Sequence, residues 1–123
     1  MDLWTRFLLL LAGLMGACGV AAAAVSAHVA GGSMLETAAY FLILHAAAVG
    51  GLVALALQVG RGGAALRIGA SALVLGALLF CGDLSSRALL EAKLLGGSAP
   101  FGGSLMIAGW LVVAGSALVA RRA

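Results

Sequence analysis

Two charged side chains, Asp83 and Arg87, lie inside the otherwise apolar stretch LLFCGDLSSRALL of residues 78–90. Residues four apart share one face of an α-helix, so the carboxylate and the guanidinium can pair. Two interpretations carry equal weight. In the first, the two residues form a functional site, as ionisable residues within a membrane span often do. Asp83 then carries a proton or binds a cation, and Arg87 adjusts the affinity of Asp83 for that ion. Alternatively, the two charges only neutralise one another, and Arg87 extends toward the membrane surface.

The two histidines are the other groups capable of acid–base or ligand chemistry. His45 lies near the middle of an apolar run, and His28 lies near the end of the preceding run. His45 is either a neutral imidazole bonded to a neighbouring helix or part of a proton relay or metal site with His28 or Asp83. No H-x3-H or C-x2-C spacing indicates a dedicated metal site. We therefore expect no metal, no other cofactor and no catalytic residues.

Trp110 is a further member of the polar set. It lies deeper in its apolar run than a residue of the membrane interface should, and its indole N–H needs an acceptor. The half of the membrane that holds the ionisable groups is where we expect that acceptor. The candidate polar site predicted from the sequence therefore comprises His28, His45, Asp83, Arg87 and Trp110.

The composition predicts an integral membrane protein. Of the 123 residues, 64% are hydrophobic and 9% charged, whereas a soluble domain carries about 25% charged residues. Near-continuous apolar runs favour helices over the alternating strands of a membrane barrel. We expect a single transmembrane domain over 1–123, an all-α bundle of four helices that each approach the roughly 20 residues needed to cross a bilayer. The expected helices cover approximately 7–30, 35–59, 68–90 and 104–120.

The connections carry their own signals. Ser33, followed by Glu36 three residues later, reads as a capping box for the second helix. The longest connection is 91–103, which we expect to be a half-apolar loop packed over one end of the bundle, with Pro100, Gly102 and Gly103 as its motif. Within the helices, pairs of small residues at i and i+4 predict close helix contacts and a self-associating bundle. These pairs are Ala12/Gly16, Gly13/Ala17, Ala46/Gly50, Ala47/Gly51 and Ala72/Gly76.

Charge placement predicts the orientation. With four spans, both termini and the 60–67 turn share one side of the membrane, and that side holds most of the cationic residues. Loops rich in Lys and Arg stay in the cytoplasm, so we expect both termini there. No basic face with interleaved aromatic residues indicates nucleic-acid binding. The cationic residues on the terminal side are Arg6, Arg61, Arg67, Arg121 and Arg122, against Arg87 and Lys93 on the other.

An ordered set of motifs resembles a known family. PFGGSLMIAGW, from Pro100 to Trp110, is similar to the family's P-x-G-G followed by G-W, and FLILHA at 41–46 has an aromatic residue four before a histidine. LLFCGDL at 78–84 is similar to L-F-S-G-S-L, with Asp83 in place of a serine. The chain thus resembles the small four-span membrane proteins catalogued as domain of unknown function 423, found in bacterial inner membranes. The resemblance implies this fold and location, and supplies no activity.

We therefore expect a non-enzymatic, multi-pass protein of the inner (plasma) membrane, surrounded by lipids, which acts as a structural or accessory component. Small size, many small residues and short loops favour self-association or packing against a larger membrane complex. Two alternatives stay open. One is a transporter or channel for a proton or small cation that uses His28, His45 and Asp83. The other is a protein that binds a lipid, a quinone or a haem in the outer leaflet.

Overall fold

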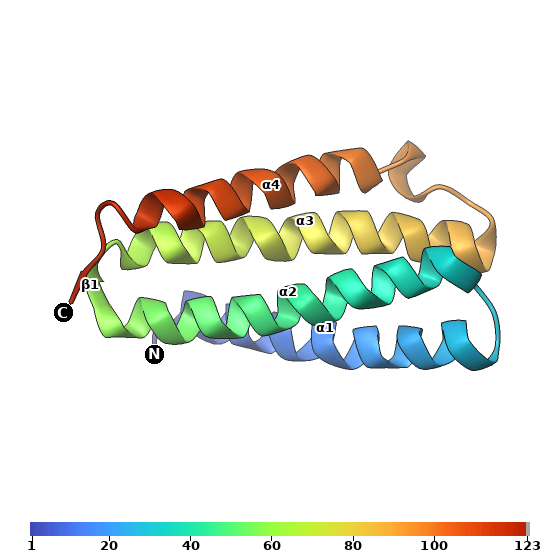
Figure 1. Ribbon diagram of the computed structural model, residues 1–123, viewed down its shortest axis with the longest axis horizontal. Coiled ribbons are helices and arrows are strands. Elements are labelled where there is room, and N and C mark those ends of the chain that lie inside the picture. The colour runs from blue at the N-terminus through green and yellow to red at the C-terminus, as the bar shows by residue number, and fades with distance from the viewer. Residues whose placement is uncertain (123) are drawn as a thin grey trace.

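The computed structural model describes residues 1–122 and consists of four antiparallel α-helices (Figure 1). Each helix is long and apolar enough to cross a membrane. The protein is therefore all-α in its membrane part, as the composition predicts, and spans the bilayer several times. The helices are α1 (Leu3–His28), α2 (Gly32–Gln58), α3 (Gly63–Leu90) and α4 (Ala99–Ser116).

Helices that follow one another in the sequence also pack against one another. The main interfaces are α1 with α2, α2 with α3 and α3 with α4, whereas α1 and α3 share a smaller one. The helices consequently form an open arrangement in which α1 and α4 lie on opposite sides of the central α2–α3 pair (Figure 1). Both termini and the α2–α3 link lie at one end, which we name the terminal end. The α1–α2 link and residues 91–98 lie at the other, the connector end.

A short ribbon closes the terminal end. Strand β1 (Val59–Arg61) pairs antiparallel with β2 (Arg121–Arg122), with Val59 opposite Arg122. The pairing brings the end of the chain back over the α2–α3 link. Gly62 adopts φ +90° there, and a Cβ atom on it would lie 2.8 Å from the Cα of Ala120. No sequence pattern indicates this ribbon, because its strands are three and two residues long.

Several helix ends differ from the predicted ones: α1 begins at Leu3 instead of 7, α3 begins at Gly63 instead of 68, and α4 ends at Ser116 instead of 120. The capping box of Ser33 and Glu36 is wrong: α2 already begins at Gly32, and its N-cap is Gly31 at φ +96°. Glu36 instead accepts a hydrogen bond from the hydroxyl of Tyr40 at 2.9 Å. A glycine that reaches the left-handed region without strain turns the chain at this point, so no side-chain cap is required.

The predicted loop motif of Pro100, Gly102 and Gly103 is also wrong, because all three residues belong to the first turns of α4. Pro100 fits there, since its fixed φ suits the first helical turn and its missing N–H has no helical partner at that position. Gly102 is needed because α4 packs directly on the backbone of α3: a Cβ atom on Gly102 would collide with the backbone nitrogen of Phe80. α4 therefore starts five residues earlier than expected.

Candidate functional site

Asp83 is the best-connected polar side chain of the protein. It is completely buried, and its carboxylate accepts four hydrogen bonds. The guanidinium of Arg87 donates two, from Nε to Oδ1 at 3.0 Å and from Nη2 to Oδ2 at 3.1 Å. The backbone N–H of Leu94 donates to Oδ1 at 3.0 Å, and that of Ala99 donates to Oδ2 at 2.9 Å. Both oxygens are therefore fully used by groups of the protein itself.

The two backbone bonds explain what Asp83 does. Leu94 is the first residue of the 3₁₀ turn η1 (Leu94–Gly96), and Ala99 is the first residue of α4. One carboxylate thus caps two elements that follow it by 11 and 16 residues. A negative charge at the start of α4 also favours the helix dipole. Asp83 is the anchor of the 91–98 connector, a role beyond neutralising Arg87.

Two serines tie the same connector to α3. Ser86 donates from Oγ to the carbonyl of Ala92 at 2.7 Å, and Ser98 donates from Oγ to the carbonyl of Leu79 at 2.8 Å. Sequence reasoning missed both. Ser98 carried a signal, since it stands directly before Ala99 and Pro100 where an N-cap is expected. Its side chain does not cap α4, because its Oγ donates to the carbonyl of Leu79 and the second helical residue, Pro100, has no N–H to offer.

His45 and Trp110 form a second polar cluster, in the middle of the membrane part. Trp110 Nε1 lies 3.2 Å from His45 Nε2, and His45 Nδ1 lies 2.8 Å from the carbonyl oxygen of Phe41. An indole N–H can only donate, so Nε2 accepts, and Nδ1 carries the hydrogen that Phe41 accepts. His45 is therefore a neutral imidazole with both nitrogens bonded, and 2% of its surface is exposed. The predicted acceptor of Trp110 is His45.

Aromatic packing fixes this histidine in place. The ring of Phe41 stacks on the imidazole with centroids 5.8 Å apart, and Phe80 packs on Phe41 at 4.7 Å. The Trp110 ring lies tilted against the imidazole, also with centroids 5.8 Å apart. The cluster thus joins α2 to α3 and α4, and gives α2 and α4 a direct hydrogen bond.

The structure separates the residues of the predicted polar site into three places. His28 is exposed in the last turn of α1, at the connector end. His45 lies 13 residues from the start of α2, about 20 Å deeper at the helical rise per residue. Asp83, seven residues before the end of α3, lies about 10 Å from that end. The structure joins Asp83 to Arg87 and His45 to Trp110, and it leaves His28 apart from both pairs.

Glycines set the contact between α3 and α4. A Cβ atom on Gly76 would lie 2.7 Å from the carbonyl oxygen of Gly102, and one on Gly109 would lie 3.0 Å from the carbonyl oxygen of Gly69. The backbones therefore touch at two levels, which small residues alone permit. This close contact brings the start of α4 within hydrogen-bonding reach of Asp83.

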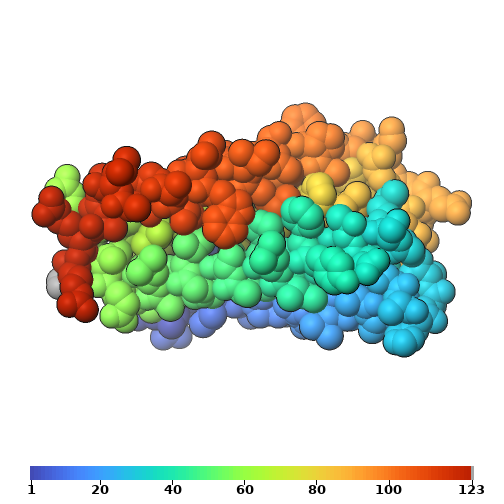
Figure 2. Space-filling view, viewed as in Figure 1, coloured from blue at the N-terminus to red at the C-terminus, as the bar shows by residue number. Residues whose placement is uncertain are grey.

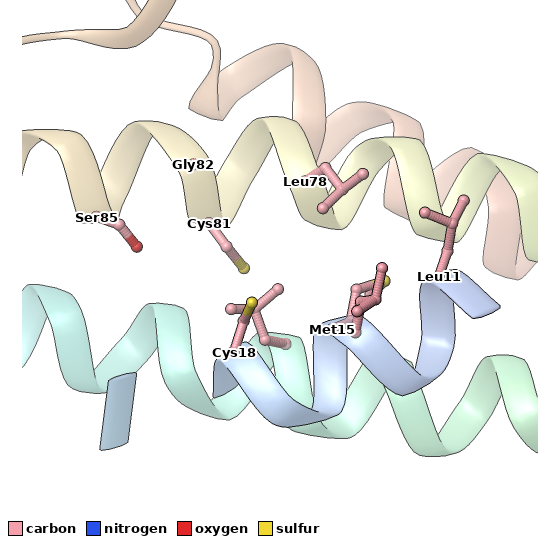
Figure 3. A pocket seen from close by; sticks show the side chains of 9 residues that line it. Leu11, Met15, Cys18, Leu78, Cys81, Gly82 and Ser85 are labelled. Atoms are coloured by element: carbon pink, nitrogen blue, oxygen red, sulfur yellow. The ribbon is translucent and has the colours of Figure 1, made fainter. Parts of the chain in front are cut away.

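A cavity of about 280 Å³ opens on the other face, between α1 and α3, where the two helices share little contact (Figure 3). Cys18 of α1 and Cys81 of α3 point toward one another across it (Figure 3). Both thiols are free; Cys81 is buried and Cys18 is exposed. Within residues 1–122, no cluster of three or more His, Cys, Asp or Glu side chains is arranged to hold a metal ion.

The contact between His45 and Trp110 predicts a stability effect. Trp110→Phe leaves the buried Nε2 of His45 without a donor, and an unsatisfied buried polar atom costs about 1–3 kcal/mol. Trp4→Phe is the matched control, because the Trp4 indole donates to the hydroxyl of Ser71 at an exposed position. Thermal unfolding in lipid nanodiscs is expected to show a clearly larger loss for Trp110→Phe. Equal losses would contradict the assignment.

Comparison with known proteins gives one match. The family described as "Protein of unknown function (DUF423)" matches residues 12–103. The match includes His28, His45, Asp83 and Arg87 and ends before Trp110. No curated protein and no solved structure matches the chain.

Proposed function

Because this chain belongs to the DUF423 family, whose proteins have no known function, we propose a role from its own structure. We infer that it is a non-enzymatic structural or accessory component of the membrane that associates with copies of itself. The observation that carries this proposal is that two of its five small-residue pairs are used inside the protein and two are left open, while Ala46/Gly50 has one residue of each kind.

Two of the predicted pairs are used internally. A Cβ atom on Gly16 would lie 3.7 Å from the Cβ of Ala46 in the α1–α2 interface, and Ala12 is buried. Gly76 packs on the backbone of α4, and the Cβ of Ala72 lies close to Gly109. These pairs give the single chain its own close contacts.

Two other pairs have no such contact. Gly13 and Ala17 of α1 are exposed, as are Ala47 and Gly51 of α2. A Cβ atom on Gly13, Gly50 or Gly51 would meet nothing within 4 Å. Small residues at i and i+4 on a lipid-facing surface allow another helix to approach closely. A second copy of the chain offers the same surface, so a symmetric dimer through α2 is the simplest assembly.

The polar side chains support this role over transport of a proton or a small cation. The carboxylate of Asp83 has four internal donors, and His45 has both ring nitrogens bonded. His28 lies about 20 Å from His45 along the membrane normal, too far for direct proton transfer. A relay through these groups would have to break bonds that hold the connector and α4 in place.

We further propose that the protein lies in the inner (plasma) membrane with both termini in the cytoplasm. Arg61, Arg121 and Arg122 are exposed at the terminal end, where the β1–β2 ribbon brings them together. An excess of cationic residues in short links favours the cytoplasmic side. The connector end, with Asp83 and Arg87, then faces outward.

The test replaces Gly51 by leucine. The position is open, so Gly51→Leu is expected to fold normally while its side chain prevents close approach of a second α2. Association measured by energy transfer between labelled copies in vesicles should weaken about tenfold. Gly115→Leu is the matched control: Gly115 is also open, but has no small residue four positions away. The proposal fails if both variants associate as the unaltered chain does, or if the unaltered chain is monomeric.

A further inference from the structure

A groove runs between α2 and α4 on the face shown in Figure 2. The surface is hollowed between the two helices there, and residues of α3, in yellow, form its floor (Figure 2). Two adjoining cavities of about 530 and 410 Å³ occupy this groove. Phe80, Gly103 and Ile107 line both cavities, so the two are continuous.

The groove has the depth of one membrane leaflet. At the connector end its lining includes Arg87 and Pro100, and at the other end His45 and Trp110 close it. Ten residues of α4 separate Pro100 from Trp110, or about 15 Å of helix. The hydrocarbon core of a bilayer is about 30 Å thick, so the groove extends from the interface to the midplane. Its length matches one lipid acyl chain of the leaflet at the connector end.

Two cationic side chains, Arg87 and Lys93, lie near the mouth of the groove. Arg87 directs Nε and Nη2 at Asp83, which leaves Nη1 free to donate, and 34% of its side chain is exposed. Lys93 is exposed on the connector. Both side chains border Gly97: a Cβ atom there would lie 3.3 Å from Arg87 Nη2 and 4.0 Å from Lys93 Cδ. Asp83 balances the charge of Arg87, and Glu91 is exposed two residues before Lys93. The donors that face an anion are therefore the free Nη1 of Arg87 and the ammonium group of Lys93, without a net positive charge at the connector end.

We propose that this groove binds an anionic phospholipid, with one acyl chain between α2 and α4 and its phosphate at Arg87 and Lys93. The apolar walls suit the chain, and Arg87 offers the planar guanidinium that phosphate oxygens bind. The lining of both cavities comes from this single chain and includes none of the open small residues of α2. The proposal therefore does not depend on self-association.

The test uses Trp110 as a reporter of the closed end of the groove. In a Trp4→Phe background Trp110 is the sole tryptophan, and acyl chains brominated near the midplane quench it on contact. Vesicles contain brominated phosphatidylglycerol in unlabelled phosphatidylcholine, or the reverse combination. One extra cation at the head group favours the anionic lipid about fivefold. Brominated phosphatidylglycerol should therefore quench Trp110 more strongly than brominated phosphatidylcholine does.

Three variants decide the interpretation. Gly103→Leu fills the groove, because Gly103 lines both cavities. A Cβ atom there would meet only Phe80 Cδ1, at 3.9 Å, so the backbone can accept the larger residue. The preference for phosphatidylglycerol over phosphatidylcholine should disappear in this variant. Lys93→Gln should reduce it while leaving the contacts of Asp83 intact. Gly115→Leu, outside the groove, should retain it. Equal quenching by the two lipids in the unaltered chain, or a preference that survives Gly103→Leu, would overturn the proposal.

Discussion

Gly102→Ala is expected to lower the free energy of unfolding by about 3 kcal/mol or more, although it adds a single methyl group. The added carbon would collide with the backbone nitrogen of Phe80. Backbone atoms cannot rotate away as a flexible side chain can, so α4 must move off α3. That movement would also stretch the hydrogen bond from the Ala99 amide to Asp83, which depends on the position of α4. Thermal unfolding in lipid nanodiscs measures the loss.

The neighbouring residue provides the matched control. A Cβ atom on Gly103 would lie 3.9 Å from Phe80 Cδ1, an ordinary contact. Gly103→Ala should therefore leave stability within about 1 kcal/mol of the unaltered chain or increase it, because alanine favours a helix over glycine. Similar effects of the two substitutions would contradict the described packing of α3 against α4.

The double substitution Asp83→Leu/Arg87→Leu is expected to lower the melting temperature by about 5–10 °C. Replacing a buried ion pair by apolar residues of similar size is often neutral or stabilising. Mutual neutralisation alone therefore predicts no loss. Here the amides of Leu94 and Ala99 lose their acceptor as well. The connector and the first turn of α4 should loosen, which hydrogen exchange at these two amides would detect.

The single substitutions distinguish the two roles of the carboxylate. Asp83→Leu removes all four hydrogen bonds, whereas Arg87→Gln removes the ion pair and leaves the two backbone amides bonded to Asp83. We expect Asp83→Leu to be the more destabilising. A double variant as stable as the unaltered chain would show that the pair serves neutralisation only.

The membrane class, the helical fold and the i, i+4 contact of Asp83 with Arg87 were predictable because they depend on composition and local spacing. The two amides that bond Asp83 were not, since they lie 11 and 16 residues away and meet it only through the path of the connector. The start of α4 was mispredicted for a related reason. Glycines at 102 and 103 usually mark a loop, but here at least Gly102 permits a backbone contact between helices.

The grouping of the polar residues was likewise only partly predictable from the sequence. Trp110 was expected to find an acceptor in the half of the membrane that holds the ionisable groups, and His45 is that acceptor. Estimated depth could not show that His28 would stay apart, because the direction in which a residue faces around its helix depends on which helices become neighbours. Sequence alone also could not divide the small-residue pairs into used and open ones.

The most direct test of the proposed role is to count the copies of the unaltered chain in nanodiscs extracted from its own membrane without detergent. Stepwise photobleaching of a fluorophore attached at the terminal end gives this number. The proposed role predicts two or more copies per disc, and a smaller share of such discs for Gly51→Leu. Single copies of the unaltered chain at every expression level would contradict it.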